Sequence, residues 1–480
     1  MDSCKIALAV LLCGVAAGAG QSQPAPRLFK NPQAEAHYQK ALEYSRKGLW
    51  APAILELNEA RQVEPANPEI LTELGIAHGE RKEWKPAIAA LQKAVAAAPG
   101  SVRAHYNLAL TLDRADPGKG AGISEYRKAL KLDPLHADSM INLAIDVGDQ
   151  NPEEAKPLFD RAIRLAPKNA NAHLNLALFL KREANESASV AEFREAVRLD
   201  PGLLEARRQL AALLMSQQQW EQVIEQCREI LKREPDDAST RYTLGQALIR
   251  DQKTDEGREE LARAQERRKQ AQQQQEAQEL QAAGVRDLNG GKFPVAIKEL
   301  NDAVRLDPSS SNRMYLGLAL AGSGDVRSGM RELSAAIEQD PNNARAHLNL
   351  GSVYLQAGQE YLAKTEFGKA VALDPWFPEA HNNLGLLLAK DHRTEEACEH
   401  FRLAARLNPE YLEAEFNLGL ALRAMKRTEE ALEAFRRAAH LAPENARVQY
   451  ALGVTLKEKG DLAGSQAALA RAAALERRAK

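Results

Sequence analysis

The sequence predicts an all-α solenoid built from about thirteen helix–turn–helix units. The first observation behind this fold class is a period of 33 to 35 residues that runs through most of the 480-residue chain. The second is composition, because Ala, Leu, Glu, Arg and Gln abound while aromatic residues make up only 5%. That balance favours helices packed through small residues. The third is that no run of alternating β-branched residues is long enough to predict a strand.

The first residues differ from the rest and predict an export signal. An uncharged apolar run from Ile6 to Gly20 follows Lys5, and it is too short to span a membrane as a stable helix. Small residues at positions 17–19 suit cleavage by a signal peptidase. We therefore expect residues 1–19 to be a signal peptide and residues 20–33 to be a linker.

The cysteines agree with export of a protein without disulfides. A lipoprotein would be modified at Cys13, but Leu11 and Leu12 stand where a small residue is expected, which argues against lipid anchoring. Cys227 and Cys398 lie far apart in apolar helical settings, and we expect both to be small core residues. The mature protein is expected to be periplasmic or secreted, with no integral membrane span after signal cleavage.

The period is clearest in the prolines that close the units. Within a unit, small residues precede the proline by twelve and by five positions, as Ala363 and Ala370 precede Pro375, and Phe367 precedes it by eight. Small residues at these places allow two helices to approach closely, and proline turns the chain into the next unit. These prolines are Pro65, Pro99, Pro134, Pro167, Pro201, Pro235, Pro308, Pro341, Pro375, Pro409 and Pro443.

This pattern resembles the tetratricopeptide repeat (TPR), a 34-residue helix–turn–helix. The resemblance covers Ala34 to the C-terminus and implies a right-handed superhelix with a concave groove along its length. No single unit can bury its apolar face, so stability comes from stacked neighbours. The units are expected to begin near Ala34, Pro68, Val102, Ala137, Ala170, Leu204, Ala238, Ala277, Ser310, Ala344, Pro378, Leu412 and Ala446.

One gap of 73 residues between closing prolines interrupts the period. It holds a full unit plus five extra residues, which fall within the Gln-rich stretch Glu266–Gln281. Because Gln, Ala and Glu favour helix, we expect a long helix or a hinged helical linker here. It divides the chain into residues 34–271, with units one to seven, and residues 272–480, with units eight to thirteen. A lengthened helix inside one continuous solenoid is the open alternative.

Six units carry an asparagine at the same place in their first helix. At about 100° per residue, this place lies on a flank of the apolar core face. An amide can pair with both the C=O and the N–H of another backbone. We therefore expect the amides to hold the main chain of an extended peptide, and leucines on the same flank to hold its side chains. The asparagines are Asn107, Asn142, Asn175, Asn349, Asn383 and Asn417, and the leucines are Leu110, Leu178, Leu318, Leu386 and Leu420.

This arrangement resembles the asparagine ladder in the superhelical repeat region of O-linked N-acetylglucosamine transferase, whose corresponding asparagines grip substrate peptide backbones. The resemblance implies peptide binding without catalysis, because the repeats take up the whole expected mature chain. An unbroken ladder is not expected, since units six to nine have Gln209, Thr243, Ala282 and Tyr315 at this place. The alternative is a structural role, in which each asparagine bonds to a nearby helix backbone.

We expect the other residues that could carry chemistry to belong to the scaffold. His105, His173, His347 and His381 stand two residues before an asparagine, towards the core face, and are expected to be packed aromatic residues. His392, Glu396 and His400 have a spacing that a metal could use, but we place them on the charged face of a second helix and assign no metal. No H-E-x-x-H or G-x-S-x-G motif is present.

These observations favour a non-enzymatic scaffold, without cofactor or metal, that binds extended or disordered segments of other proteins. The formal net charge of −2 gives no electrostatic reason to bind nucleic acid. The alternative function is that of an accessory or assembly subunit of an envelope complex, which docks folded partners through its ends or its convex face. The oligomeric state is left open.

Overall fold

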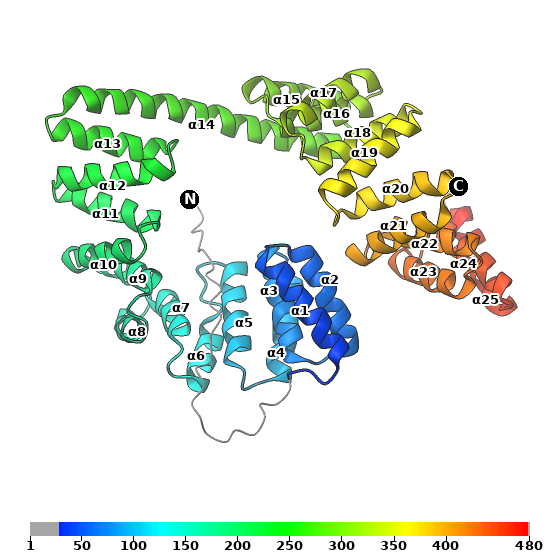
Figure 1. Cartoon of the computed structure of the whole chain (residues 1–480), viewed down its shortest axis with the longest axis horizontal. Coiled ribbons are helices and arrows are strands. Elements are labelled where there is room, and N and C mark those ends of the chain that lie inside the picture. Colours follow the sequence, from blue (N-terminus) through cyan, green and yellow to red (C-terminus); the bar gives the residue numbers. More distant parts are fainter. Residues whose placement is uncertain (1–27, 479–480) are drawn as a thin grey trace.

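The computed structural model describes residues 28–478, which form 25 helices and no strand, so the predicted all-α fold class is confirmed. Consecutive helices pack in pairs along a curved array (Figure 1). In units one to seven the first helices are α1 (Pro32–Arg46), α3 (Pro68–Glu80), α5 (Val102–Ala115), α7 (Ala137–Val147), α9 (Ala170–Arg182), α11 (Leu204–Ser216) and α13 (Ala238–Arg250). The second helices of units one to six are α2 (Trp50–Val63), α4 (Trp84–Ala97), α6 (Ile123–Leu132), α8 (Pro152–Leu165), α10 (Glu186–Leu199) and α12 (Trp220–Arg233).

The later units follow the same plan. Their first helices are α16 (Ser310–Gly322), α18 (Ala344–Gln356), α20 (Pro378–Lys390), α22 (Leu412–Ala424) and α24 (Ala446–Lys459). Their second helices are α15 (Phe293–Leu306), α17 (Val326–Gln339), α19 (Glu360–Leu373), α21 (Thr394–Leu407), α23 (Thr428–Leu441) and α25 (Leu462–Arg478). Eleven of the thirteen expected unit starts coincide with the first residue of a helix.

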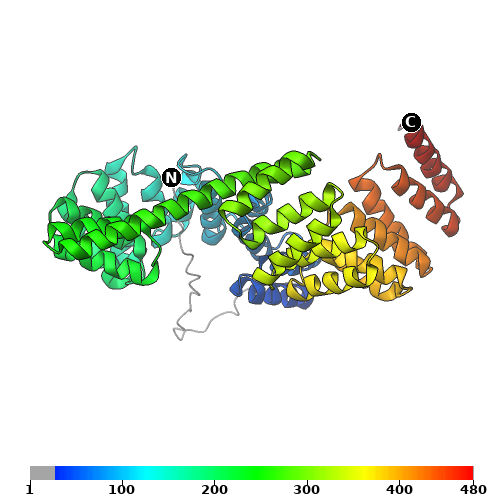
Figure 2. The same ribbon diagram turned by 90° about the horizontal axis from the view of Figure 1, so that it is seen from above.

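The count of 25 helices is one short of thirteen pairs because α14 (Thr254–Asn289) serves two units. Its first half packs on α13 as the second helix of unit seven, and its second half packs on α15 as the first helix of unit eight. The Gln-rich stretch forms the middle of this 36-residue helix, where residues 265–276 are exposed on all sides. Figures 1 and 2 show α14 as the long green helix that joins the two groups of repeats. A long helix was expected here; the division into two domains stays a prediction.

Close approach of the two helices in a unit depends on the small residue at its eighth place. In unit ten a Cβ atom added to Gly351 would lie 2.7 Å from the ring of Phe367, which is fully buried. Gly419 faces Phe435 in unit twelve in the same way, at 2.6 Å. The phenylalanine ring therefore fills the space that the missing side chain leaves.

In eleven of the thirteen units, the turn between the two helices has a left-handed residue at the fifteenth place of the unit. Glycine occupies several of these turns, as Gly358 does with φ 74°. Elsewhere a residue with a side chain adopts the same conformation, and His392 does so with φ 61°. Our prediction that His392 lies on a second helix was therefore wrong, because α21 begins only at Thr394.

Each of the histidines near the asparagines is buried but makes polar bonds. The Nε2–H of His347 donates to the carbonyl of Pro341 at 3.2 Å, and Nδ1 lies 2.6 Å from Oε2 of Glu366 on α19. His105 and His173 make the same two contacts in their units. Each side chain thus connects the preceding turn to both helices of its own unit, a role that the prediction of simple aromatic packing did not include.

First helices line the inner side of the curve. Those of successive units contact one another directly, as α3 contacts α5, α7 contacts α9, and α20 contacts α22. Second helices of successive units do not approach to a comparable extent within residues 28–478. The flank that carries the asparagines therefore belongs to the concave face. No helix of the described residues combines the length and hydropathy needed to cross a bilayer.

Candidate peptide-binding groove

The six predicted asparagines all lie on first helices and all are half-buried. In the first set, Asn107 donates from Nδ2 to the carbonyl of Arg103 at 2.8 Å, and Asn175 donates to Asn171 at 2.8 Å. Asn142 donates to the carbonyl of Asp138 at 3.1 Å. Each bond runs back one turn along the same helix, which is the local satisfaction that polar helix residues often find.

The second set is bonded differently. Asn417 donates from Nδ2 to Oδ1 of Asn382 at 2.9 Å, which links α22 to α20. Asn382 in turn donates to Oδ1 of Asn383 at 3.4 Å. The side chain of Asn349 makes no comparable hydrogen bond to another residue within residues 28–478. Asn382, only 3% exposed, is a polar member of this network that the sequence reasoning missed; the unusual pair of adjacent asparagines in AHNNLG was its only signal.

The predicted leucines differ in their exposure. Leu110, Leu178 and Leu318 are half-buried. Leu386 and Leu420 are 42% and 39% exposed on α20 and α22. At these leucine positions, units eleven and twelve therefore present more open apolar surface than units three and five.

Two aromatic side chains on the same flank extend this apolar surface. Tyr450 of α24 is 58% exposed. Phe416 of α22 lies under the guanidinium of Arg447, 5.4 Å from the ring centroid. Because aromatic rings and arginine are common contact residues in protein interfaces, both belong to the candidate surface.

The interruption of the asparagine series coincides with a hollow on the concave face. A space of about 360 Å³ lies between α11, α12 and α13, with Met215, Cys227 and Ile230 among its lining residues. Thr243, which replaces asparagine in unit seven, is part of its wall. The Thr243 hydroxyl donates to the carbonyl of Ser239 at 3.1 Å. A small hydroxyl here leaves room that an amide would fill.

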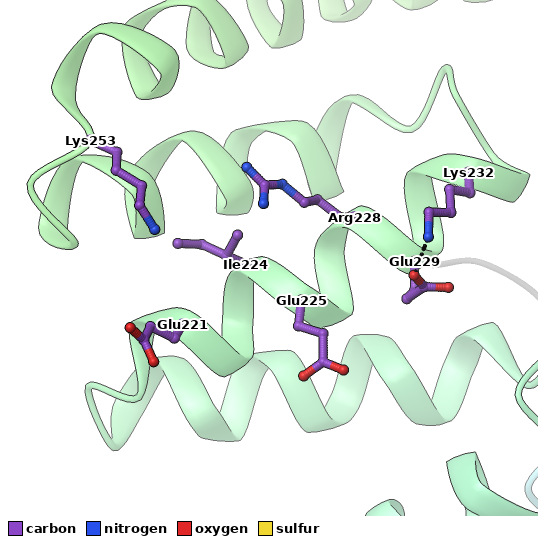
Figure 3. A pocket seen from close by; sticks show the side chains of 7 residues that line it. All are labelled: Glu221, Ile224, Glu225, Arg228, Glu229, Lys232 and Lys253. Atoms are coloured by element: carbon purple, nitrogen blue, oxygen red, sulfur yellow. Dashed lines mark hydrogen bonds and ion pairs between the residues drawn. The ribbon is translucent and has the colours of Figure 1, made fainter.

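A second hollow, of about 380 Å³, carries only charged side chains and one isoleucine (Figure 3). Its charges largely pair among neighbours: Arg228 lies 2.6 Å from Glu256, and Lys232 pairs with Glu229. No excess of either sign gathers there, so this hollow has no evident ligand chemistry. It is lined by Glu221, Ile224, Glu225, Arg228, Glu229, Lys232 and Lys253.

A pair of carboxylates lies beside the first asparagine set. Burial, and then the nearby charge of Asp113 on α5, raises the pKa of Asp146 on α7 to about 7. Oδ2 of Asp146 is buried without a hydrogen-bond partner within the described residues. Asp113 accepts a bond from the backbone N–H of Gly122 at 2.7 Å. Near neutral pH, Asp146 therefore holds a proton about half of the time.

Burial raises the pKa of Tyr106, between these same helices, to about 12, with a further contribution from Asp138. Its hydroxyl accepts from Nδ2 of Asn142 at 3.4 Å. The phenol is thus neutral at any ordinary pH. It supplies a second, uncharged partner for the only asparagine of the first set that bridges two units.

The residues with metal-compatible spacing do not come together. His392 lies in the turn, Glu396 pairs with Arg393 at 2.6 Å, and Nδ1 of His400 lies 2.8 Å from Nδ1 of His381. Within the part of the chain that the structure describes, no group of three or more His, Cys, Asp or Glu side chains could hold a metal. The two cysteines at positions 227 and 398 are buried free thiols, as expected.

The repeat pattern matches known families. Models described as tetratricopeptide repeat match residues 31–102, 72–137, 146–203, 333–365 and 378–411, and one described as TPR repeat matches residues 419–460. Together these matches cover more than half of the chain. A curated relative, the TPR repeat-containing thioredoxin TTL4 of Arabidopsis thaliana, is 32% identical over 92 residues. The match spans 19% of this chain and only 14% of that relative.

Solved structures show similar repeat folds. MamA is 26% identical, with 34% of this chain and 95% of that chain covered and a TM-score of 0.32. PilF of Pseudomonas aeruginosa is 20% identical, with 41% and 90% covered and a TM-score of 0.39. The APC/C hetero-tetramer Cut9–Hcn1 is 14% identical, with 92% and 94% covered and a TM-score of 0.35. At these TM-scores the likeness carries no functional information.

Proposed function

The chain belongs to the tetratricopeptide repeat family, whose repeats serve protein–protein interaction, and from that premise we propose that its concave face binds extended segments of other proteins. As a protein of tetratricopeptide repeats, the chain is an interaction scaffold. We propose more specifically that amides on the first helices hold the main chain of the bound segment.

One observation supports this role of the amides most directly. Their hydrogen bonds within the protein use only some of their donor and acceptor groups. An asparagine side chain has two N–H donors and one carbonyl acceptor. Asn107 and Asn175 each use one donor within their own helix. The carbonyl and a second N–H are left to meet the N–H and C=O of a neighbouring backbone. The structural role and the binding role are therefore compatible in the same residue.

Units ten to twelve are expected to contribute most to peptide binding by this candidate surface. Asn349, Asn383 and Asn417 lie on successive first helices, α18, α20 and α22. Beside them, Leu386 and Leu420 are open enough to receive side chains of a bound segment. Main-chain bonding through amides tolerates many sequences, and the apolar row adds a preference for segments with apolar side chains.

The test compares two triple variants with the unchanged protein. A phage-displayed library of random 16-residue peptides is selected on the full chain, and the best binder is synthesised with a fluorescein label. Losing three neutral hydrogen bonds of about 1 kcal/mol each predicts roughly a hundredfold weaker binding by N349A/N383A/N417A. N107A/N142A/N175A is expected to lose less, and N301A on the outer helix α15 is the matched control.

Circular dichroism melts must show that each variant folds like the parent. Unchanged affinity in both triple variants with an unchanged melt would reject the groove as the binding surface. That result would favour the alternative function, in which folded partners dock through the ends or the convex face.

We also propose that the protein is exported, with cleavage near Ala19, to the periplasm or the outside of the cell. This proposal depends on the sequence alone, because residues 1–19 lie outside the described residues. Mass spectrometry of the N-terminus of the protein from its native source tests it. A processed N-terminus near residue 20 in an envelope or medium fraction would support export, and an intact Met1 in the cytosol would exclude it.

A further inference from the structure

The first repeat touches a part of the array far away in the sequence. Glu59 on α2 and Arg406 on α21 form an ion pair at 2.8 Å, although 347 residues separate them. Nearby, the ring of Tyr44 on α1 packs edge-on against Trp376, which precedes α20, with centroids 5.6 Å apart. The backbones of α2 and α21 also come close. Figure 1 shows α2 and α21 meeting where the array has curved round upon itself.

This contact has a consequence for the groove. The asparagine-bearing helices α5, α7, α9, α18 and α20 lie along the array between the two contact points, α2 and α21. The touching turns therefore close a ring around the concave face over most of its length. A segment of polypeptide that binds this face and passes through the ring would be encircled.

We propose that unit one is a latch that closes the superhelix around a bound segment and must open before a segment without a free end can enter. This proposal rests on the proposed function, because it concerns access to the same groove. According to this proposal the superhelix has an open and a closed state, which the repeats alone do not imply.

The contact has the features of a latch and not of a permanent interface. Its specific side-chain interactions are one ion pair and one aromatic pair, and each favours the closed over the open arrangement by a factor of about ten or less. The side chains of Glu59 and Arg406 are 27% and 46% exposed, so water and salt reach them. Arg406 also lies near Lys40, a like charge that opposes the contact.

The array itself supplies the motion that opening needs. In a solenoid each unit contacts only its neighbours, and small rotations per unit add along the chain. Between unit one and unit eleven lie nine units and the bare middle of α14. A small change in each step therefore separates α2 from α21 without breaking any unit.

The first test measures the latch without any ligand. Small-angle X-ray scattering of the full chain is compared with R406E, with the charge-reversed pair E59R/R406E, and with R228E as control. R228E breaks an exposed ion pair between neighbouring units, Arg228 with Glu256, at 2.6 Å. We expect R406E to increase the radius of gyration, E59R/R406E to restore it, and R228E to leave it unchanged. Equal dimensions for all four proteins would overturn the latch.

The second test asks whether the latch controls access. E59C/R406C is made in a chain that also carries C4S and C13S, and it is locked with a bismaleimide reagent. This reagent does not reach the buried native thiols at positions 227 and 398 while the protein is folded. The fluorescein peptide is offered with free ends, or with a folded domain fused at each end. We expect the locked protein to bind the free-ended probe normally and to bind the capped probe at least a hundredfold more slowly. The unlocked protein should bind both.

The outcomes separate the two proposals. Equal association rates of both probes with the locked protein would show that the groove is open from the side, which overturns the latch and leaves the proposed function intact. If even the unchanged protein binds neither probe, the proposed function fails and the latch loses its role in access. Scattering would still report whether the ring opens.

Discussion

The half-buried carboxyl of Asp146 leads to a quantitative prediction about stability and pH. Its pKa is raised from 3.8 to about 7 by burial and by the neighbouring Asp113. A folded-state pKa above the unfolded value means that the folded protein holds the proton more tightly. The contribution to stability is therefore full below pH 3.8 and is lost as pH rises through 7. Replacing Asp146 by Asn keeps the shape and removes the titration.

The size of the effect follows from the pKa change. At 1.36 kcal/mol for each pKa unit, a fully enclosed carboxyl would lose about 4 kcal/mol over this range. Asp146 is only half-buried, so water screens its charge and we expect about 1–2 kcal/mol. Asp146→Asn should therefore be more stable than the parent at pH 8, and this advantage should shrink towards pH 4.5.

Urea denaturation at several pH values, together with hydrogen exchange of amides in α5 and α7, measures this difference. Hydrogen exchange is the sharper readout because a repeat array can open locally. D302N is the matched control, since Asp302 pairs with Arg305 on the surface of α15 at 3.1 Å. A stability difference between D146N and the parent that is the same at pH 4.5 and pH 8 would refute the reasoning.

Three further predictions concern other parts of the scaffold. Burial raises the pKa of Cys227 to about 12, so iodoacetamide at pH 8 should label this thiol only after unfolding, and rapid labelling of the native protein would contradict its burial. Glu366→Gln weakens the bond to His347 and should cost about 1–3 kcal/mol in thermal or urea denaturation, whereas Glu395→Gln on the exposed face of α21 should cost little. Gln273→Pro in the exposed middle of α14 should lower the free energy of unfolding by about 3 kcal/mol and change the radius of gyration, while Gln273→Ala should do neither. Equal radii of gyration for both variants would show that α14 does not hold the two groups of repeats in place.

Much of the fold was predictable because it is local. Gly351 and Phe367 contact each other within one unit, and the 34-residue spacing repeats this kind of contact along the chain. The starts of α5, α18 and α22 could therefore be read to the residue. His392 was placed on a helix by mistake because the usual local signal of the turn, a glycine, is missing there. Most units have a left-handed residue in this turn. Glycine signals it in some units, whereas in unit eleven the residue is His392, which gives no such signal in the sequence.

The site was less predictable because its hydrogen bonds depend on neighbours. Asn107 and Asn417 stand at equivalent places in the sequence, yet one bonds within its own helix and the other bonds to Asn382 in the preceding unit. The partner of Asn417 depends on Asn382, because most other units have an apolar or aromatic side chain at the equivalent place. A periodic pattern predicts where an amide lies, and its partners follow only from the residues that differ between units.

The contact between Glu59 and Arg406 lies furthest from what a repeat pattern can predict. Whether unit one meets unit eleven depends on the sum of ten small rotations and on the length of α14. Removing the five extra residues of that helix would change its length by about 7.5 Å and turn the later units by about 140°, at 1.5 Å and 100° per residue. Neither Glu59 nor Arg406 would then find its partner, although every unit would fold as before. The Gln-rich insertion, which interrupts the period, is thus the feature that sets how the two ends of the ring meet.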